Sequence, residues 1–151
     1  MNTLLDLRRE HASAEEIVAH FLGCDAAFLA LLRARVNLPD YASKLQTRAL
    51  RFETWSGTRL AGLLAVYHDA ATGTAYISNV SVLSEFCRQG IASQMLTACL
   101  AHARQLDLRG ITLEVASENQ AAIALYRRHD FTALPATDGP RLRMQWQFQH
   151  R

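Results

Sequence analysis

The chain lacks any apolar run approaching the roughly 20 residues that cross a bilayer, which argues against a transmembrane helix. Charged residues within the first ten positions interrupt the apolar core that a secretory signal peptide requires. The three cysteines are odd in number and lack CxxC spacing, so neither a disulfide framework nor a thiolate metal site is indicated. These absences predict a soluble protein of the reducing cytoplasm that binds no metal and no membrane.

A strong charge of one sign is also absent. The net charge is +2, and the lysines and arginines are too scattered to form the basic stripe on which nucleic-acid binding depends. The six histidines show neither HxH nor HExxH spacing. Half of the 151 residues are hydrophobic and a fifth are charged, which is typical of a globular protein. We therefore expect a single domain over residues 1–151 that binds no nucleic acid.

Two helices are predicted before residue 50. The segment SAEEIVAHFL (13–22) has a capping Ser, a Glu three positions later and apolar residues at helical spacing, and it ends at Gly23. A second helix is expected from about Pro39 to Ala49, where Tyr41 and Leu45 lie on one side.

The rest of the chain predicts strands and two further helices. Three antiparallel strands are expected because aromatic and β-branched runs alternate with the turn segments SGT and DAATG. These strands are LRFETW (50–55), RLAGLLAVYH (59–68) and TAYISNVSVL (74–83). The later elements are a helix at 91–106, a strand at 111–116, a helix at 118–131, and strands at 131–134 and 141–148, the last two separated by PATDGP. The strand, helix and strand around Gly90 form a crossover unit, which makes its two strands parallel. The predicted class is α/β (α+β), with a mixed, largely antiparallel sheet flanked by helices.

The turn FCRQGIAS (86–93) has the features of an anion site. A strand that enters a helix through Gly90 directs unpaired backbone N–H groups to one point, where the helix dipole also favours negative charge. It has neither the Gly-Lys-Ser/Thr ending of a Walker loop nor the three glycines of a dinucleotide motif. A purely structural turn is the alternative on these residues alone.

The order of three segments narrows this choice. NVSV, then CRQGIA, then LEVASENQAAIALYRRHDF resemble the GCN5-related N-acetyltransferase (GNAT) superfamily, over about Leu50 to Phe148. The resemblance implies the GNAT acyl-CoA N-acyltransferase fold and acetyl-CoA as cosubstrate. It also implies that residues 50–148 form the acetyl-CoA-binding core and that the mainly helical residues 1–49 face the acceptor.

Site residues follow by position within these motifs. The resemblance implies that the pyrophosphate is bound by consecutive backbone amides, those of Arg88, Gln89, Gly90, Ile91 and Ala92. Val80 and Val82 would offer main-chain groups to the pantetheine arm like an added strand, with the Val82 N–H polarising the thioester carbonyl. Asn119 would lie beside the same arm, and Tyr126 would protonate the leaving thiolate.

Glu114 is the candidate general base. Alternation in ITLEVA places Ile111, Leu113 and Val115 on one face and Glu114 on the other, and a Glu at this place serves as the base in some GNAT members. A partly exposed or Arg-paired Glu114 is the equal alternative.

Two positions depart from the family pattern. Cys87 stands where Arg or Gln is usual, which leaves the backbone donors intact, and a catalytic role is disfavoured because no His lies nearby. Asp130 replaces a Gly, a mild change because Asp tolerates left-handed backbone.

The resulting hypothesis is an acetyl-CoA-dependent N-acetyltransferase that transfers the acetyl group directly to a primary amine of a small molecule. A non-catalytic CoA or acyl-CoA sensor module and an unrelated interaction protein are the alternatives. The segment FLALLRARVNLPDYASKL (28–45) is expected to set acceptor specificity, although its Arg33, Arg35, Asp40 and Tyr41 also fit a solvated helical face. The sequence identifies neither the acceptor nor whether the C-terminal strands mediate a homodimer.

Overall fold

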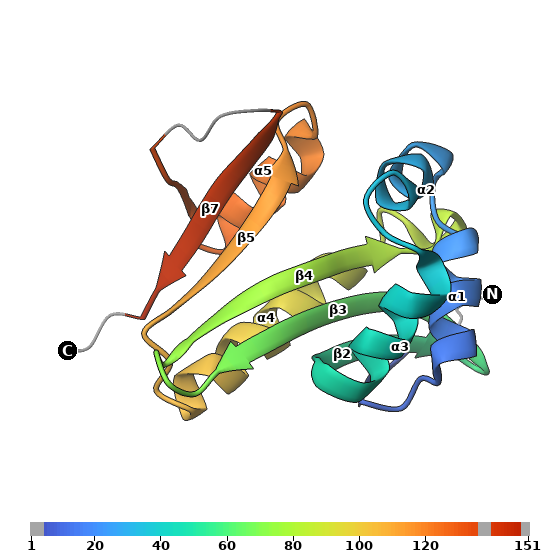
Figure 1. Ribbon diagram of the computed structural model, residues 1–151, viewed down its shortest axis with the longest axis horizontal. Coiled ribbons are helices and arrows are strands. Elements are labelled where there is room, and N and C mark those ends of the chain that lie inside the picture. Colours follow the sequence, from blue (N-terminus) through green and yellow to red (C-terminus); the bar gives the residue numbers. More distant parts are fainter. Residues whose placement is uncertain (1–4, 136–139, 149–151) are drawn as a thin grey trace.

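The computed structural model describes residues 5–135 and 140–148. The strands in these residues form one seven-stranded sheet. The strands lie in the order β1-β2-β3-β4-β5-β7-β6 (Figure 1). Their bounds are β1 Leu5–Arg9, β2 Leu50–Ser56, β3 Arg59–Asp69, β4 Thr74–Val82, β5 Gly110–Ala116, β6 Thr132–Ala133 and β7 Arg141–Gln147. All neighbouring pairs are antiparallel except β4 and β5, which are parallel. The predicted mixed, largely antiparallel sheet is confirmed.

Helices cover both faces of this sheet and bury a separate apolar cluster on each. They are α1 Ala14–Leu22, α2 Ala26–Arg33, α3 Leu38–Arg48, α4 Ile91–Gln105 and α5 Gln120–Arg128, with a short 3₁₀ helix at Ser84–Phe86. Helices α1 to α3 pack against β2 and β3 around Trp55, Leu63 and Ala65. Helices α4 and α5 pack on the opposite face around Ile77 and Leu113. None of the described helices has the length and apolar character needed to span a membrane.

The elements with strong local signals are confirmed. Ser13 caps α1 by accepting a hydrogen bond from the Glu16 N–H at 3.1 Å, and the Glu16 carboxylate accepts one from the Ser13 N–H at 2.9 Å. The chain leaves α1 at Gly23, as its sequence predicts. The turn predicted between the last two strands includes residues 136–139, which lie outside the described residues.

Two elements were missed. Helix α2 is capped by the preceding Asp25, whose carboxylate accepts from the Phe28 N–H at 3.4 Å, but the helix has no acidic residue in its first turn. Strand β1 reads LDLRR, too charged for a strand by pattern, yet it pairs with β2 along its whole length. Its arginines pack on aromatic rings of β2: Arg8 lies 5.3 Å from the Trp55 ring centroid and Arg9 lies 4.5 Å from that of Phe52. The predicted helical region 1–49 therefore also supplies an edge strand.

A buried ion pair joins the N-terminal elements to the sheet. Arg51 Nε lies 2.9 Å from Glu53 Oε2, and both side chains are almost fully buried. Glu53 also accepts hydrogen bonds from the Trp55 indole at 3.0 Å and from the backbone N–H groups of His11 and Ala12. The Arg51 guanidinium donates to three main-chain carbonyls, those of Ala12, Leu45 and Gln46. Because every charge has partners, the pair stabilises the contact between β2, α3 and the chain before α1.

Candidate active site

Strands β4 and β5 pair over only part of their length. The parallel ladder joins Thr74–Ile77 to Gly110–Leu113, whereas β4 continues to Val82 and β5 to Ala116. Beyond these pairs the strands diverge, as Figure 1 shows. We call residues 78–82 and 114–116 the β4–β5 fork.

A β-bulge between β3 and β4 lies where the fork begins. Val66 of β3 pairs with Ile77, and the preceding Ala65 pairs with Asn79, which leaves Ser78 with no residue opposite. The extra residue reverses the alternation of faces along β4. After it, even-numbered side chains face the cluster under α4, and odd-numbered ones face α1.

Val80 and Val82 direct main-chain groups into the fork. Leu83 donates to the Ala61 carbonyl at 2.8 Å, so these two residues form a hydrogen-bonded pair of the β3–β4 ladder. Such pairs alternate with non-hydrogen-bonded ones, so Val82, opposite Gly62, points its N–H and C=O away from β3. Val80 does the same two residues earlier. Since β5 pairs with neither, the two N–H groups and the Val80 carbonyl are available to a ligand, whereas the Val82 carbonyl lies 4.0 Å from the Cys87 Sγ. This is the arrangement that the predicted pantetheine contact requires.

The turn after β4 presents a run of unpaired backbone donors. Arg88 and Gly90 adopt positive φ angles of 67° and 78°. The backbone N–H groups from Arg88 through the first three residues of α4 bond to no group in the described chain, and this set includes those of Gln89, Gly90, Ile91 and Ala92. The five predicted pyrophosphate donors thus lie together and unpaired, although their role stays a prediction.

The start of α4 differs from the other described α-helix starts. In those four helices a side-chain oxygen accepts a hydrogen bond from a first-turn N–H, supplied by Ser13, Asp25, Asn37 and Asn119. Helix α4 begins at Gly90, which has no side chain to do so. No atom lies within 4 Å of a Cβ placed there, so the space beside the turn is open. This helix end therefore fits an external anion.

Tyr126 contributes to the same apolar cluster as Val80 and Val82. Burial raises the pKa of its phenol to about 12. Its hydroxyl has no hydrogen-bond partner within the described residues, and its ring lies 5.9 Å from that of Phe131. Asn119 has a structural role at the other end of α5, where its Oδ1 accepts from the Ala122 N–H at 3.1 Å. Only the Nδ2 of Asn119 is left for the predicted contact with a ligand.

Glu114 lies in the fork on the face opposite that cluster. Its neighbours Leu113 and Val115 are buried, whereas Glu114 is 36% exposed at its side chain, which confirms the predicted alternation. Its Oε2 lies 3.6 Å from Arg141 Nε. The carboxylate is thus reachable from solvent and paired with an arginine, as the alternative interpretation expected. Its role as base stays a prediction.

A buried polar chain behind the fork was missed by sequence reasoning. The His20 Nδ1–H donates to the Leu60 carbonyl at 2.8 Å, so the neutral ring accepts at Nε2 from the Ser81 hydroxyl, also at 2.8 Å. Asn79 Nδ2 donates in turn to the Ser81 oxygen at 2.8 Å. Burial lowers the pKa of His20 to about 4. The signal available was a histidine on the apolar face of α1.

Two of the three cysteines are buried: Cys99 on α4, and Cys24 in the turn after α1, where its Sγ lies 3.7 Å from the His20 Nε2. Burial raises the pKa of both thiols to about 12. The exposed Cys87 thiol lies 3.5 Å from the Leu83 carbonyl. Asp130 has φ 70°, the left-handed backbone expected of it. Among the described residues, no cluster of three or more His, Cys, Asp or Glu could hold a metal ion.

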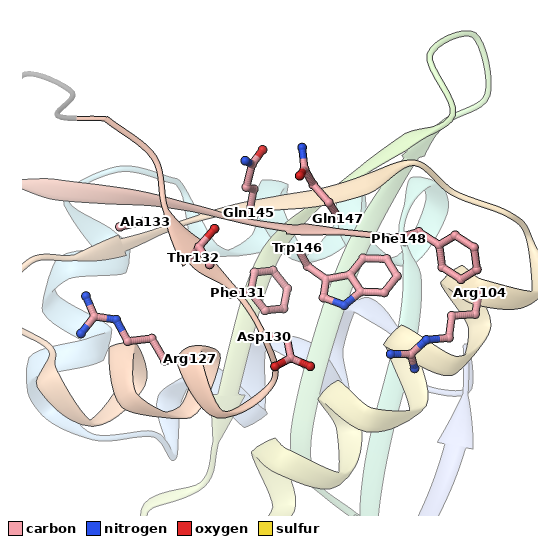
Figure 2. Close-up of a pocket in the computed structure, with 10 residues that line it drawn as sticks. All are labelled: Arg104, Arg127, Asp130, Phe131, Thr132, Ala133, Gln145, Trp146, Gln147 and Phe148. Carbon is pink, nitrogen blue, oxygen red and sulfur yellow. The ribbon is translucent and has the colours of Figure 1, made fainter. Parts of the chain in front are cut away.

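A cavity of about 960 Å³ lies between α4, α5 and the β6–β7 strands, and Asp130 is one of its lining residues. Figure 2 shows the rings of Phe131 and Trp146 at its floor, with Arg104 of α4 and Arg127 of α5 on its two sides. None of the predicted site residues lines it.

Comparison with known proteins agrees with this geometry. Residues 13–131 match the model of the Acetyltransferase (GNAT) family. The chain belongs to this family. The resemblance inferred from the three motifs is therefore confirmed.

Known relatives match this GNAT-family chain over different shares of its length. GCN5-related N-acetyltransferase 4, chloroplastic, of Arabidopsis thaliana is 35% identical over 68 residues, which are 45% of this chain and 23% of that protein. The matched segment thus covers less than a quarter of that relative's length. The PaiA N-acetyltransferase of Thermoplasma acidophilum in complex with coenzyme A superposes with a TM-score of 0.77 at 13% identity, covering 96% of this chain and 99% of that one. The ribosomal-protein-S18-alanine N-acetyltransferase of Escherichia coli gives 0.77 at 19% identity, covering 98% and 96%. These structures show a shared fold.

Proposed function

We propose that this protein transfers the acetyl group of acetyl-CoA directly to the primary amine of a small molecule, in a ternary complex. The observation that carries the proposal is the continuity of the β4–β5 fork with the uncapped start of α4. Main-chain groups without a backbone partner lie at both ends of this path, at Val80 and Val82 in the fork and from Arg88 to Ala92 in the turn. The coenzyme A bound by the T. acidophilum relative supports the same class of ligand here.

Each portion of the cosubstrate has a matching feature. The pyrophosphate fits the open turn at Gly90, where consecutive N–H groups and the α4 dipole favour negative charge. The amide groups of the pantetheine arm match the outward main-chain groups of Val80 and Val82, like an added strand. The thioester would then lie in the fork, where the Val82 N–H would stabilise negative charge on its carbonyl oxygen.

Tyr126 is suited to protonate the leaving thiolate. With a pKa of about 12, its phenol keeps its proton at neutral pH. A buried phenol that still carries its proton can donate that proton to a thiolate formed beside it.

Glu114 would act on the amine from the opposite face. The carboxylate removes one proton from the ammonium, directly or through water, and the freed amine attacks the thioester carbon. Collapse of the tetrahedral intermediate breaks the carbon–sulfur bond, and the second nitrogen proton leaves to solvent as Tyr126 protonates the sulfur. The phenolate regains its proton from solvent, and Glu114 releases to solvent the proton that it took from the ammonium. The products are an N-acetylated acceptor, CoA thiol and one net proton.

Release of free thiol from acetyl-CoA in the presence of an amine panel tests the proposal. Tyr126→Phe and Glu114→Gln should each lower kcat by about a hundredfold or more, with little change in acetyl-CoA affinity. Glu15→Gln, an exposed carboxylate in the first turn of α1, should keep full activity. Full activity in both site variants would remove the proton-transfer assignments. CoA binding without thiol release by any amine would instead indicate a non-catalytic CoA-binding module.

A further inference from the structure

The sheet carries a polar face on the acceptor side of the fork. Alternation along β5 and β7 places apolar side chains in the cluster under α4 and α5, and the remaining side chains on the other face. The polar residues among them are Thr112, Glu114, Arg141, Arg143, Gln145 and Gln147. The apolar cluster that α1 to α3 cover includes residues of β2 and β3 but none of β5 or β7. In Figure 1 these helices stand beside β5 and β7 rather than over them.

Three tyrosines border this face. Tyr67 and Tyr76 lie directly opposite each other on β3 and β4, and Tyr76 lies opposite Thr112 on β5. The Tyr41 hydroxyl of α3 is 2.5 Å from the Ser78 hydroxyl at the bulge. All three rings are half-buried, so they form an aromatic border between the helices and the polar face.

Positive charge predominates on the polar face. Glu114 lies opposite Arg143 on the neighbouring strand, and Arg141 reaches back to Glu114. Burial and the charge of Glu114 raise the pKa of Tyr76, whereas Arg141, Arg35 and Arg143 lower it, so all four charges lie near this phenol.

Two of these arginines are available to a ligand. Arg141 is engaged by Glu114, but Arg35 and Arg143 form no ion pair with any carboxylate of the described chain. Both are exposed. The carboxylate of Glu114 therefore lies among three guanidinium groups, those of Arg35, Arg141 and Arg143. Two of these, on Arg35 and Arg143, can each use all their N–H donors to bind an anion.

We propose that the acceptor carries a carboxylate close to its primary amine, as an α-amino acid does, and that Arg143 and Arg35 bind this carboxylate while Glu114 faces the amine. The inference rests on the proposed acetyl transfer and assigns its substrate class. The carboxylate of the acceptor pairs with the guanidinium groups of Arg143 and Arg35, and the ammonium of the acceptor pairs with the carboxylate of Glu114. Within the aromatic border, the ring of Tyr76 contacts an apolar or aromatic side chain of the acceptor.

Matched acceptors that differ only in the carboxylate test this assignment. We expect kcat/KM for thiol release to be at least about tenfold higher with tyrosine than with tyramine, and higher with phenylalanine than with phenethylamine, a tenfold ratio corresponding to about 1.4 kcal/mol. Arg143→Gln and Arg35→Gln should each reduce this preference by lowering kcat/KM for the carboxylate-bearing acceptors. Arg33→Gln is the matched control and should keep the preference, because Arg33 is an exposed arginine at the end of α2, two residues from Arg35.

Calorimetric binding of tyrosine and tyramine in the presence of CoA separates this inference from the activity. Turnover without a carboxylate preference, or a preference that both arginine variants retain, would overturn the inference while acetyl transfer stands. Binding that needs the carboxylate and Arg143, without turnover, would support the recognition and refute the activity. Neither turnover nor carboxylate-dependent binding would overturn both.

Discussion

Acid should destabilise this protein through His20. The imidazole is 2% exposed, and burial lowers its pKa from 6.5 to about 4. As the pH falls below about 6.5, the unfolded chain binds a proton at His20 that the folded chain does not bind until about pH 4. Each step of acidification in this window therefore favours the unfolded state. A second proton on Nε2 would also replace the hydrogen bond that this nitrogen accepts from Ser81.

The two pKa values set the magnitude. Going from about pH 7 to about pH 5, His20 alone should remove about 2 kcal/mol from the free energy of unfolding. Below about pH 4 the loss in the free energy of unfolding levels off at about 3 kcal/mol, the free energy that corresponds to the difference between the two pKa values.

Urea unfolding at these two pH values provides the assay, with His20→Gln and His68→Gln beside the wild type. The wild type and His68→Gln, which alters an exposed residue at the end of β3, should lose about 2 kcal/mol more than His20→Gln does. Equal losses in all three proteins would refute the reasoning. So would a wild-type His20 imidazole that titrates at its ordinary pKa in an NMR pH series, a measurement that does not depend on the variant folding.

Two further predictions concern the turn and the buried ion pair. Gly90→Val places a β-branched residue at φ 78°, which costs about 1–3 kcal/mol of strain, and it should weaken CoA binding measured by calorimetry by more than about tenfold. Cys87→Ala leaves the backbone donors intact and should change the CoA affinity little. Equal effects of the two substitutions would contradict donation by the main chain. Arg51→Met leaves the buried Glu53 charge without its partner and should lower the free energy of unfolding by about 3–5 kcal/mol; a loss below about 1 kcal/mol in urea would show that the carboxylate is satisfied by its remaining hydrogen bonds.

The main features of the candidate site have local signals in the sequence. The strand, glycine turn and helix around Gly90 suggest either an anion site or a purely structural turn, and the structure leaves the N–H groups of that turn unpaired. Alternation in β5 likewise places Glu114 on the correct face. The partner of Glu114 was not identified, because Arg141 reaches it through strand pairing across 27 residues of chain.

The sequence by itself determined the elements whose ends are written in nearby residues, such as α1 with its Ser13 and Glu16 cap, and the parallel crossover between β4 and β5. The tertiary structure alone decided where those two strands part, because the bulge at Ser78 depends on the register between β3 and β4. It also decided that β1 is a strand, since that segment gains its backbone partners only beside β2. His20 and Ser81 meet across 61 residues for the same reason. Caps and alternation act within a few residues, whereas register and buried polar contacts depend on segments that only the fold brings together.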